Sequence, residues 1–120
     1  MIWKQRKIFK QREKDIQKEI IEYLRYKGYY TINCDPMFAL SYIQSDKLRI
    51  PFICEMKRKG WTKGQPDIIA ISPKGNVIFA ELKTNKGVLS TEQKEFQEFC
   101  KITGLNYYIW RSIDDCISSI

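Results

Sequence analysis

The chain has 120 residues, of which 21 are Lys or Arg and 14 are Asp or Glu, so its formal net charge is +7. This length suits one domain with one modest core, and we take residues 1–120 as a single domain that opens with a basic segment, residues 1–12. A basic excess favours a polyanionic partner, with nucleic acid as the leading candidate, because Lys and Arg displace the counterions of phosphates.

Several functional classes are excluded by what the sequence lacks. It has no histidine, which excludes Ser-His and Cys-His triads, histidine zinc sites and nucleases with a histidine general base. Its longest strictly apolar runs have four residues, whereas a membrane span needs about 20, and its N-terminus lacks the apolar stretch of a secretion signal. We therefore expect a cytoplasmic protein without a membrane partner. Its four cysteines form no Cys-x-x-Cys pair and are expected to be buried free thiols.

The first half of the chain combines one strong helical pattern with weaker strand patterns. Apolar residues at helical spacing predict a helix from about Glu13 to Lys27. Aromatic and β-branched residues predict a strand over Tyr29–Asn33 and, less clearly, strands over Met37–Ile43 and Leu48–Met56. The segment Lys57–Gly64 reads as a basic loop with one tryptophan, for which a solvated loop and a nucleic-acid contact are both open.

The second half predicts a hairpin followed by a helix, a strand and a helix. The apolar runs Ile68–Ile71 and Val77–Ala80 flank a Pro-Lys-Gly loop that is typical of a three-residue hairpin connection. Beyond it, Ser90 offers a helix cap and Gly104 a helix end, with a strand over Asn106–Trp110 and a short helix from about Ile113. The order predicts a mixed α/β domain with a central sheet flanked by helices.

The hairpin brings two acids together. If Ser72 pairs with Asn76, counting back along both strands places Asp67 opposite Glu81, with their Cβ atoms about 5 Å apart. Opposed carboxylates destabilise a sheet unless a cation lies between them. Lys83 follows Glu81 by two residues and shares its face. Oxygen ligands without histidine favour Mg²⁺ or Mn²⁺, and this arrangement suits phosphodiester hydrolysis.

Alternatives remain for this site. Three Glu-x-Lys triplets occur; the one at Glu92 lies on a predicted helix, where its side chains diverge, whereas the one at Glu55 follows a predicted strand and competes with that at Glu81. A solvated strand end without metal is the other reading. Glu13 faces inward at the start of the first helix, either complementing the helix dipole or approaching the metal.

The same residues form motifs that occur in a characteristic order. The central set is Gly64-Gln65-Pro66-Asp67, Glu81-Leu82-Lys83, Lys86-Gly87 and Leu89-Ser90-x-x-Gln93. The outer set is Glu13-x-x-Ile16-Gln17, Tyr23-Leu24, Asn33 and Arg111-Ser112-x-Asp114-Asp115. Together they resemble the virus-type replication-repair nuclease (VRR-NUC) domain of the PD-(D/E)xK nuclease superfamily.

The resemblance implies a restriction-endonuclease-like fold and metal-dependent cleavage of DNA. Carried over by position, the implied metal ligands are Asp67, Glu81, Glu13 and the backbone carbonyl of Leu82. Lys83 would orient the attacking water or stabilise charge, and Gln93 would be a further site residue, although its position also fits a capping box with Ser90. The DNA contacts we expect are Gln17, Lys57, Arg58, Lys59, Trp61, Lys63 and Lys86.

Small members of this family, common in phages, are similar to junction resolvases, which implies a homodimer acting on branched or junction DNA in a bacterial or phage-infected cell. Two other functions stay open: a DNA-binding module that keeps the fold without chemistry, and a restriction-type nuclease that reads a duplex sequence. Residues 34–63 form a longer connection than the family pattern has, and Met37–Met56 within it is a candidate association surface.

Overall fold

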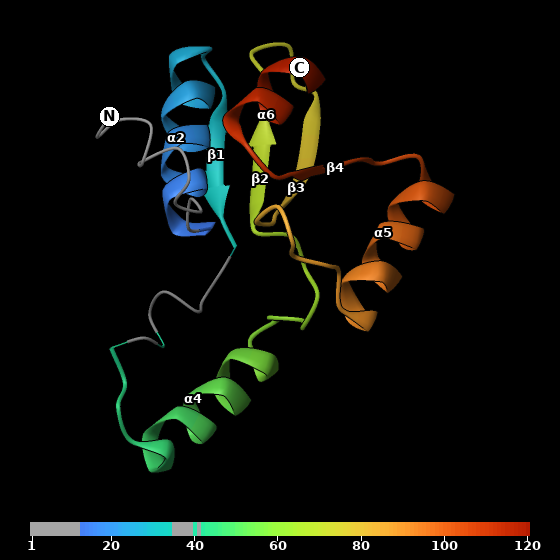
Figure 1. The fold of residues 1–120 in the computed structure, drawn as a ribbon. Helices are drawn as coiled ribbons and strands as arrows, with labels where there is room; N and C mark the ends of the chain where they lie inside the picture. The colour runs from blue at the N-terminus through green and yellow to red at the C-terminus, as the bar shows by residue number, and fades with distance from the viewer. Residues whose placement is uncertain (1–12, 35–39, 41) are drawn as a thin grey trace, which may run out of the picture.

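The computed structural model describes residues 13–34, 40 and 42–120, with side chains from residue 15 onward (Figure 1). The basic segment 1–12 and most of the predicted strand Met37–Ile43 therefore lie outside the described residues. The described elements, in chain order, are α2 (Glu13–Tyr26), β1 (Tyr30–Asn33), α4 (Asp46–Arg58), β2 (Ile68–Ile71), β3 (Val77–Leu82), α5 (Thr91–Thr103), β4 (Asn106–Trp110) and α6 (Ile113–Ser119).

The strands form one mixed sheet in the order β1-β2-β3-β4. The first two neighbouring pairs are antiparallel, and β3 pairs with β4 in parallel. A parallel pair needs a long crossover, and α5 provides it between β3 and β4. The predicted central mixed sheet flanked by helices is confirmed.

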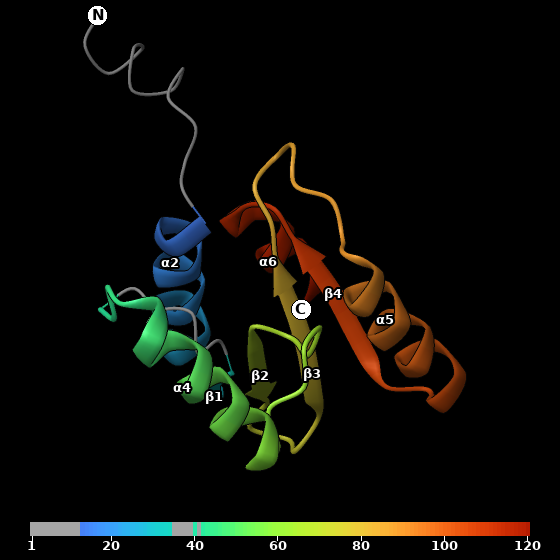
Figure 2. The ribbon, with the colours of Figure 1, turned by 90° about the horizontal axis from the view of Figure 1, so that it is seen from below.

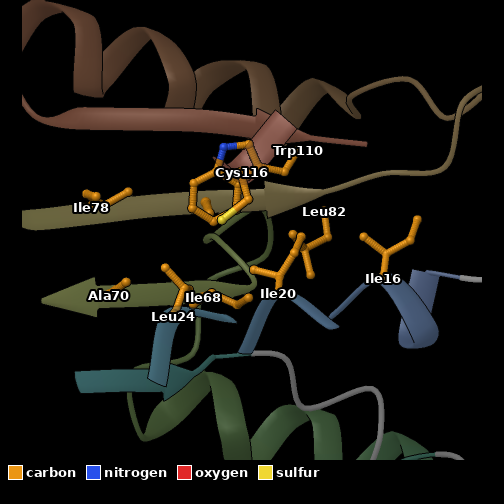
Figure 3. Close-up of a cluster of buried hydrophobic side chains, with 10 residues drawn as sticks. Ile16, Ile20, Leu24, Ile68, Ala70, Ile78, Leu82, Trp110 and Cys116 are labelled. Carbon is orange, nitrogen blue, oxygen red and sulfur yellow. The ribbon is translucent and has the colours of Figure 1, made fainter. Parts of the chain in front are cut away.

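Helices cover both faces of this sheet. On one face α2 and α6 bury the main core, in which Figure 3 shows the α2 side chains lying against β2 and β3. Its fully or nearly buried members are Ile16, Ile20, Leu24, Ile68, Ala70, Ile78, Ala80, Leu82, Trp110 and Cys116. On the other face α5 packs Phe96 edge-to-face against Phe79 and Tyr107, with ring centroids 5.7 Å apart in each pair. The side chains of β3 thus alternate between the two faces.

The predicted strand Leu48–Met56 is wrong, because this stretch belongs to α4. Its apolar residues alternate with other residues at period two, which imitates a strand, and Pro51 argues against a helix interior. The helix follows the Ser45-Asp46 start and ends in Lys57 and Arg58, so its end charges complement the helix dipole. The predicted basic loop therefore begins inside the last turn of α4.

Helix α4 stands apart from the rest of the fold. It lies beyond the end of the sheet at which β2 begins and α5 starts (Figure 1), and in the view from below it lies on the viewer's side of the sheet (Figure 2). It buries none of its residues. Among the described helices, none has the length and apolar character needed to cross a bilayer. All four cysteines are free thiols, as predicted, but only Cys100 and Cys116 are buried; Cys34 is half-buried and Cys54 is exposed.

Candidate active site

The hairpin between β2 and β3 has the predicted register. The Ser72 amide donates to the Asn76 carbonyl at 2.8 Å, and the Gly75 amide donates to the Ser72 carbonyl at 2.9 Å. The strand pairing runs from Ile71 opposite Val77 to Ile68 opposite Ala80. One further step along this register brings Asp67 opposite Glu81, on the face that α5 covers.

Asp67 is fixed by both its backbone and its carboxylate. Its amide donates to the Ala80 carbonyl at 3.1 Å, and its carbonyl accepts from the Cys34 amide at 2.8 Å. Its Oδ2 accepts a hydrogen bond from the Leu82 amide at 2.8 Å. The half-buried carboxylate, just before β2, therefore points toward the end of β3.

Glu81 is the one charged side chain among the buried residues that the structure describes, with 1% of its surface exposed. Gln93 on α5 donates from Nε2 to Glu81 Oε1 at 2.7 Å. The same Gln93 side chain completes the capping box of α5, since its Oε1 accepts from the Ser90 amide at 2.8 Å. One Gln93 side chain thus completes the capping box and contacts the Glu81 carboxylate.

Lys83 continues β3 on the face of Glu81. Its amide donates to the Trp110 carbonyl at 3.0 Å, which extends the parallel pairing with β4 by one residue. Its aliphatic chain runs beside Gly87, where an added Cβ would lie 3.3 Å from Lys83 Cδ. The side chain therefore lies against the loop that follows β3.

That loop is held in place by Arg111 at the end of β4. The Arg111 guanidinium Nη1 donates to the carbonyls of Thr84 at 2.7 Å and Gly87 at 2.6 Å. The Arg111 amide donates to Asp115 Oδ2 at 2.8 Å, which anchors it to the start of α6. Arg111 thus holds the loop beside which the Lys83 side chain lies.

Two neighbouring groups respond to the negative charge of the acids. Burial, and next the nearby Glu81 carboxylate, raise the pKa of the Tyr107 hydroxyl above its usual value, and Asp67 adds to this. Burial, and next Asp67, also raise the pKa of the Cys34 thiol. Both groups therefore stay protonated and neutral at neutral pH beside the acids.

Tyr107 and Arg111 were not assigned roles from the sequence. Tyr107 stands in an aromatic strand, and its closeness to Glu81 follows from the parallel pairing of β3 with β4, which no local pattern reveals. Its hydroxyl is buried and makes no hydrogen bond within the described residues. Arg111 is part of the Arg111-Ser112-x-Asp114-Asp115 motif, but the carbonyls to which it donates are seen only in the structure.

The competing triplet at Glu55 does not form a strand site. It lies on α4, where residues two apart point about 200° away from each other. Glu55 instead forms exposed ion pairs with Arg58 at 3.3 Å and Lys59 at 3.8 Å. Because the strand prediction for this segment is wrong, its claim to a metal site is removed as well.

The remaining predicted site residues come from α2, from α4 and the loop after it, and from the loop after β3. The side chain of Glu13, at the first position of α2, is outside the described residues, and Gln17 is half-buried one turn later. Lys63 pairs with Glu92 at 3.5 Å, next to Gln93. Four further cations of the predicted DNA contacts are exposed: Lys57 and Arg58 in the last turn of α4, Lys59 after it, and Lys86 in the loop after β3.

The donor chemistry of this site fits a hard divalent cation. Asp67 and Glu81 supply carboxylate oxygens from adjacent strands, which is the ligand type that Mg²⁺ and Mn²⁺ prefer. The hydrogen bonds to these carboxylates orient them. Among the residues whose side chains are described, no group of three or more acids or cysteines gathers, so the acids form a pair there.

Comparisons with known proteins agree on one family. The model of the family described as "VRR-NUC domain" matches residues 11–114. A solved structure described as a VRR_NUC domain is similar with a TM-score of 0.62 and 20% sequence identity, covering 89% of this chain and 95% of that chain. A search of curated proteins gives no match.

Proposed function

Because the chain belongs to the VRR-NUC family of nuclease domains, we propose that it is a deoxyribonuclease that depends on Mg²⁺ or Mn²⁺ and cleaves branched or junction DNA. The observation that carries this proposal is the pairing of Asp67 and Glu81 at one end of the hairpin. Glu81 is buried and oriented by Gln93, and Lys83 follows on the same face. Carboxylate oxygens are the ligands that Mg²⁺ and Mn²⁺ prefer.

Asp67, Glu81 and the backbone carbonyl of Leu82 would hold the cation, with Glu13 as a further candidate ligand. When bound, the ion would supply Lewis acidity at the scissile phosphate and lower the pKa of water, so that a nucleophile is available at neutral pH. Asp67 would keep its orientation through the bond from the Leu82 amide.

Lys83 and Gln93 have complementary roles in this proposal. The Lys83 ammonium would hold the attacking water or balance the charge that develops on the phosphate oxygens. Gln93 would be a positioning residue, because its amide donates to Glu81 and limits the orientations of that carboxylate. The loop contact with Gly87 and the bonds from Arg111 would restrict where Lys83 points.

The basic surface supports DNA as the substrate. The formal charge is +7. The last turn of α4 carries the exposed cations Lys57 and Arg58, and α4 lies beyond the end of the sheet at which β2 begins (Figure 1). Lys and Arg contacts with phosphates add sequence-independent affinity. A homodimer would let two copies hold separate arms of a junction, and light scattering in solution would test this assembly.

The experiment that tests the activity compares cleavage of a four-way junction with cleavage of a linear duplex of the same sequences, with Mg²⁺ and with EDTA. Asp67→Asn and Lys83→Ala should each reduce the rate by at least about a hundredfold. Lys74→Ala, in the exposed hairpin loop, is the matched control. Undiminished cleavage by either site variant would refute the role of that residue.

The same samples separate this function from its rivals. A non-catalytic DNA-binding module would bind the junction without cutting it and would take up no Mn²⁺ in a calorimetric titration. A restriction-type nuclease would cut the linear duplex at a defined sequence as fast as the junction. Preferential, metal-dependent cutting of the junction supports the proposal over both.

A further inference from the structure

A pocket of about 360 Å³ lies where α4 ends, away from the paired acids. Its apolar walls are Phe52, Met56 and Trp61, and Glu55 and Lys59 complete the lining. This volume falls within the range of about 300–1,000 Å³ that small-molecule sites occupy. The pocket is therefore large enough to take one planar heterocycle.

The end of α4 builds this pocket through its own hydrogen bonds. The Trp61 amide donates to the Met56 carbonyl at 2.9 Å, and the Gly60 amide donates to the Lys57 carbonyl at 3.2 Å. These two bonds form a Schellman motif, in which the residue after the glycine turns back onto the helix. The motif sets the Trp61 ring beside Met56, so the pocket is formed before any ligand arrives.

The pocket has an apolar wall without an apolar cover. Helix α4 buries no residue, and Phe52 keeps 37% of its surface exposed. Aromatic rings that stay accessible beside cations are the usual means by which proteins stack unpaired bases. A solvated core edge would instead have its aromatic side chains packed inward.

The charge around the pocket identifies the kind of ligand. Residues 57–63 contain four cations and no acid. Three of these cations, Arg58, Lys59 and Lys63, form ion pairs of 3.3–3.8 Å with exposed acids. Exposed ion pairs contribute little, about 0–1 kcal/mol each, so phosphates can take over these cations at small cost. The ligand should therefore carry both a flat base and a phosphate.

The loop from the pocket to Asp67 is fixed to the body of the fold. Gln65 Nε2 donates to the Cys34 carbonyl at 2.9 Å, and the Gln65 Oε1 accepts from the Thr62 amide at 3.2 Å. On the other side, Gly64 lies against Glu92, the residue before Gln93 in α5. The loop thus sets the pocket at a defined position relative to the paired acids.

The sequence separation limits how far the pocket can lie from the acids. Trp61 and Asp67 are six residues apart, which is at most about 20 Å for an extended chain. A DNA strand advances about 3.4 Å per nucleotide in a duplex. A base in the pocket would therefore lie within about six nucleotides of a phosphate at Asp67.

We propose that this pocket binds one unstacked nucleobase of branched DNA, with Trp61 and Phe52 contacting the base and the cations of residues 57–63 contacting its phosphates. The inference rests on the proposed function in taking DNA as the substrate. It adds a recognition site that distinguishes a branch, which exposes unstacked bases, from a continuous duplex, which does not.

The test uses the full chain in EDTA, so that binding is measured without cleavage. A junction carries the fluorescent base 2-aminopurine at an unpaired position next to the branch, and its fluorescence and anisotropy follow the titration. Wild type should quench the probe as the base stacks on Trp61. Trp61→Ala should bind the junction about tenfold more weakly without quenching, and Trp61→Phe should restore part of both.

Two controls separate stacking from general affinity. Wild type and Trp61→Ala should bind a fully paired linear duplex equally, because that DNA offers no unstacked base. Lys74→Ala should behave as wild type on both DNAs. Equal junction binding by Trp61→Ala and wild type, or quenching that persists in Trp61→Ala, would overturn the proposal, as would a wild-type chain that binds neither DNA.

The remaining outcomes distinguish other occupants and other failures. If light scattering shows that Trp61→Ala turns a dimer into a monomer, the pocket belongs to a contact between two copies and the proposal is overturned. Adenosine monophosphate should not compete with the junction for the pocket. If it restores the 2-aminopurine fluorescence at an equal concentration, the pocket binds free nucleotides and the proposal is overturned. Stacking without cleavage in Mg²⁺ would support the pocket and refute the nuclease activity alone.

Discussion

Gln93 Nε2 donates a hydrogen bond to Glu81 Oε1 at 2.7 Å while Gln93 Oε1 accepts from the Ser90 amide. One side chain thus joins the start of α5 to the buried acid of β3. Because Ser90 Oγ also accepts from the Gln93 amide at 3.2 Å, the cap and the carboxylate are positioned by one set of bonds. A change in the Gln93 side chain should therefore affect both the helix cap and the candidate metal site.

Two substitutions separate these roles. Ser90→Ala removes one capping acceptor, should lower the free energy of unfolding by about 1 kcal/mol, and should leave cleavage nearly unchanged. Gln93→Glu keeps a capping-box acceptor but sets a carboxylate against Glu81, so cleavage should fall at least about tenfold. Urea unfolding and junction cleavage are the two measurements.

The dependence of the free energy of unfolding on pH tests the contact between residue 93 and Glu81 separately from the helix cap. The paired carboxylates of Gln93→Glu should share a proton, with a folded pKa raised above the unfolded value of about 4.3. Stability from that proton is present below about pH 4.3 and is lost as pH rises through the raised pKa. A wild-type pH profile for Gln93→Glu would contradict the pairing.

The hairpin could be predicted from sequence because its determinants are local. The loop around Gly75 sets the register, and the register alone brings Asp67 opposite Glu81. Helix α4 could not be predicted, because its apolar residues recur at period two, which favours a strand. It buries none of its residues, so its sequence carries no apolar stripe at helical spacing. The closeness of Tyr107 and Arg111 to the site depends on a parallel strand pairing across a helical crossover, which carries no local signal.

Metal binding should stabilise the fold through Asp67, whatever the rate of catalysis. A ligand at a hundred times its Kd raises the free energy of unfolding by about 2.7 kcal/mol. The Tm of wild type should therefore rise with Mn²⁺, while that of Asp67→Asn should not. In EDTA the variant should be at least as stable as wild type, because one of two opposed carboxylates is neutral. An equal Mn²⁺ shift in both proteins would remove Asp67 from the ligand set.

Gly64 should tolerate no side chain, for a reason that Gly75 does not share. Both have a left-handed backbone, with φ of +91° and +88°. A Cβ at Gly64 would lie 2.6 Å from the Glu92 carbonyl carbon and oxygen, whereas nothing lies within 4 Å of one at Gly75. Gly75→Ala should cost about 1 kcal/mol of unfolding free energy.

Gly64→Ala should cost more than this and should also slow cleavage, because the loop or the start of α5 must move and Gln93 follows Glu92 directly. Chemical denaturation and the junction assay on the matched pair measure both effects. Equal stabilities for the two alanine variants would show that the contact between Gly64 and Glu92 is not close in solution.

Cys116 should make the fold less stable in alkaline solution. It is fully buried in the core beside Trp110, and burial raises the pKa of its thiol to about 11 from a usual value of 9.0. Because the folded pKa is the higher one, the unfolded chain releases this proton first, so stability holds below about pH 9 and falls as pH rises towards 11. The loss attributable to Cys116 should reach about 2 kcal/mol. Between pH 7 and 11 the free energy of unfolding should fall less steeply with pH for Cys116→Ala than for wild type. The control Cys54→Ala, at an exposed thiol, should keep the wild-type slope. A wild-type slope in Cys116→Ala would assign the alkaline loss to other groups, such as Tyr107.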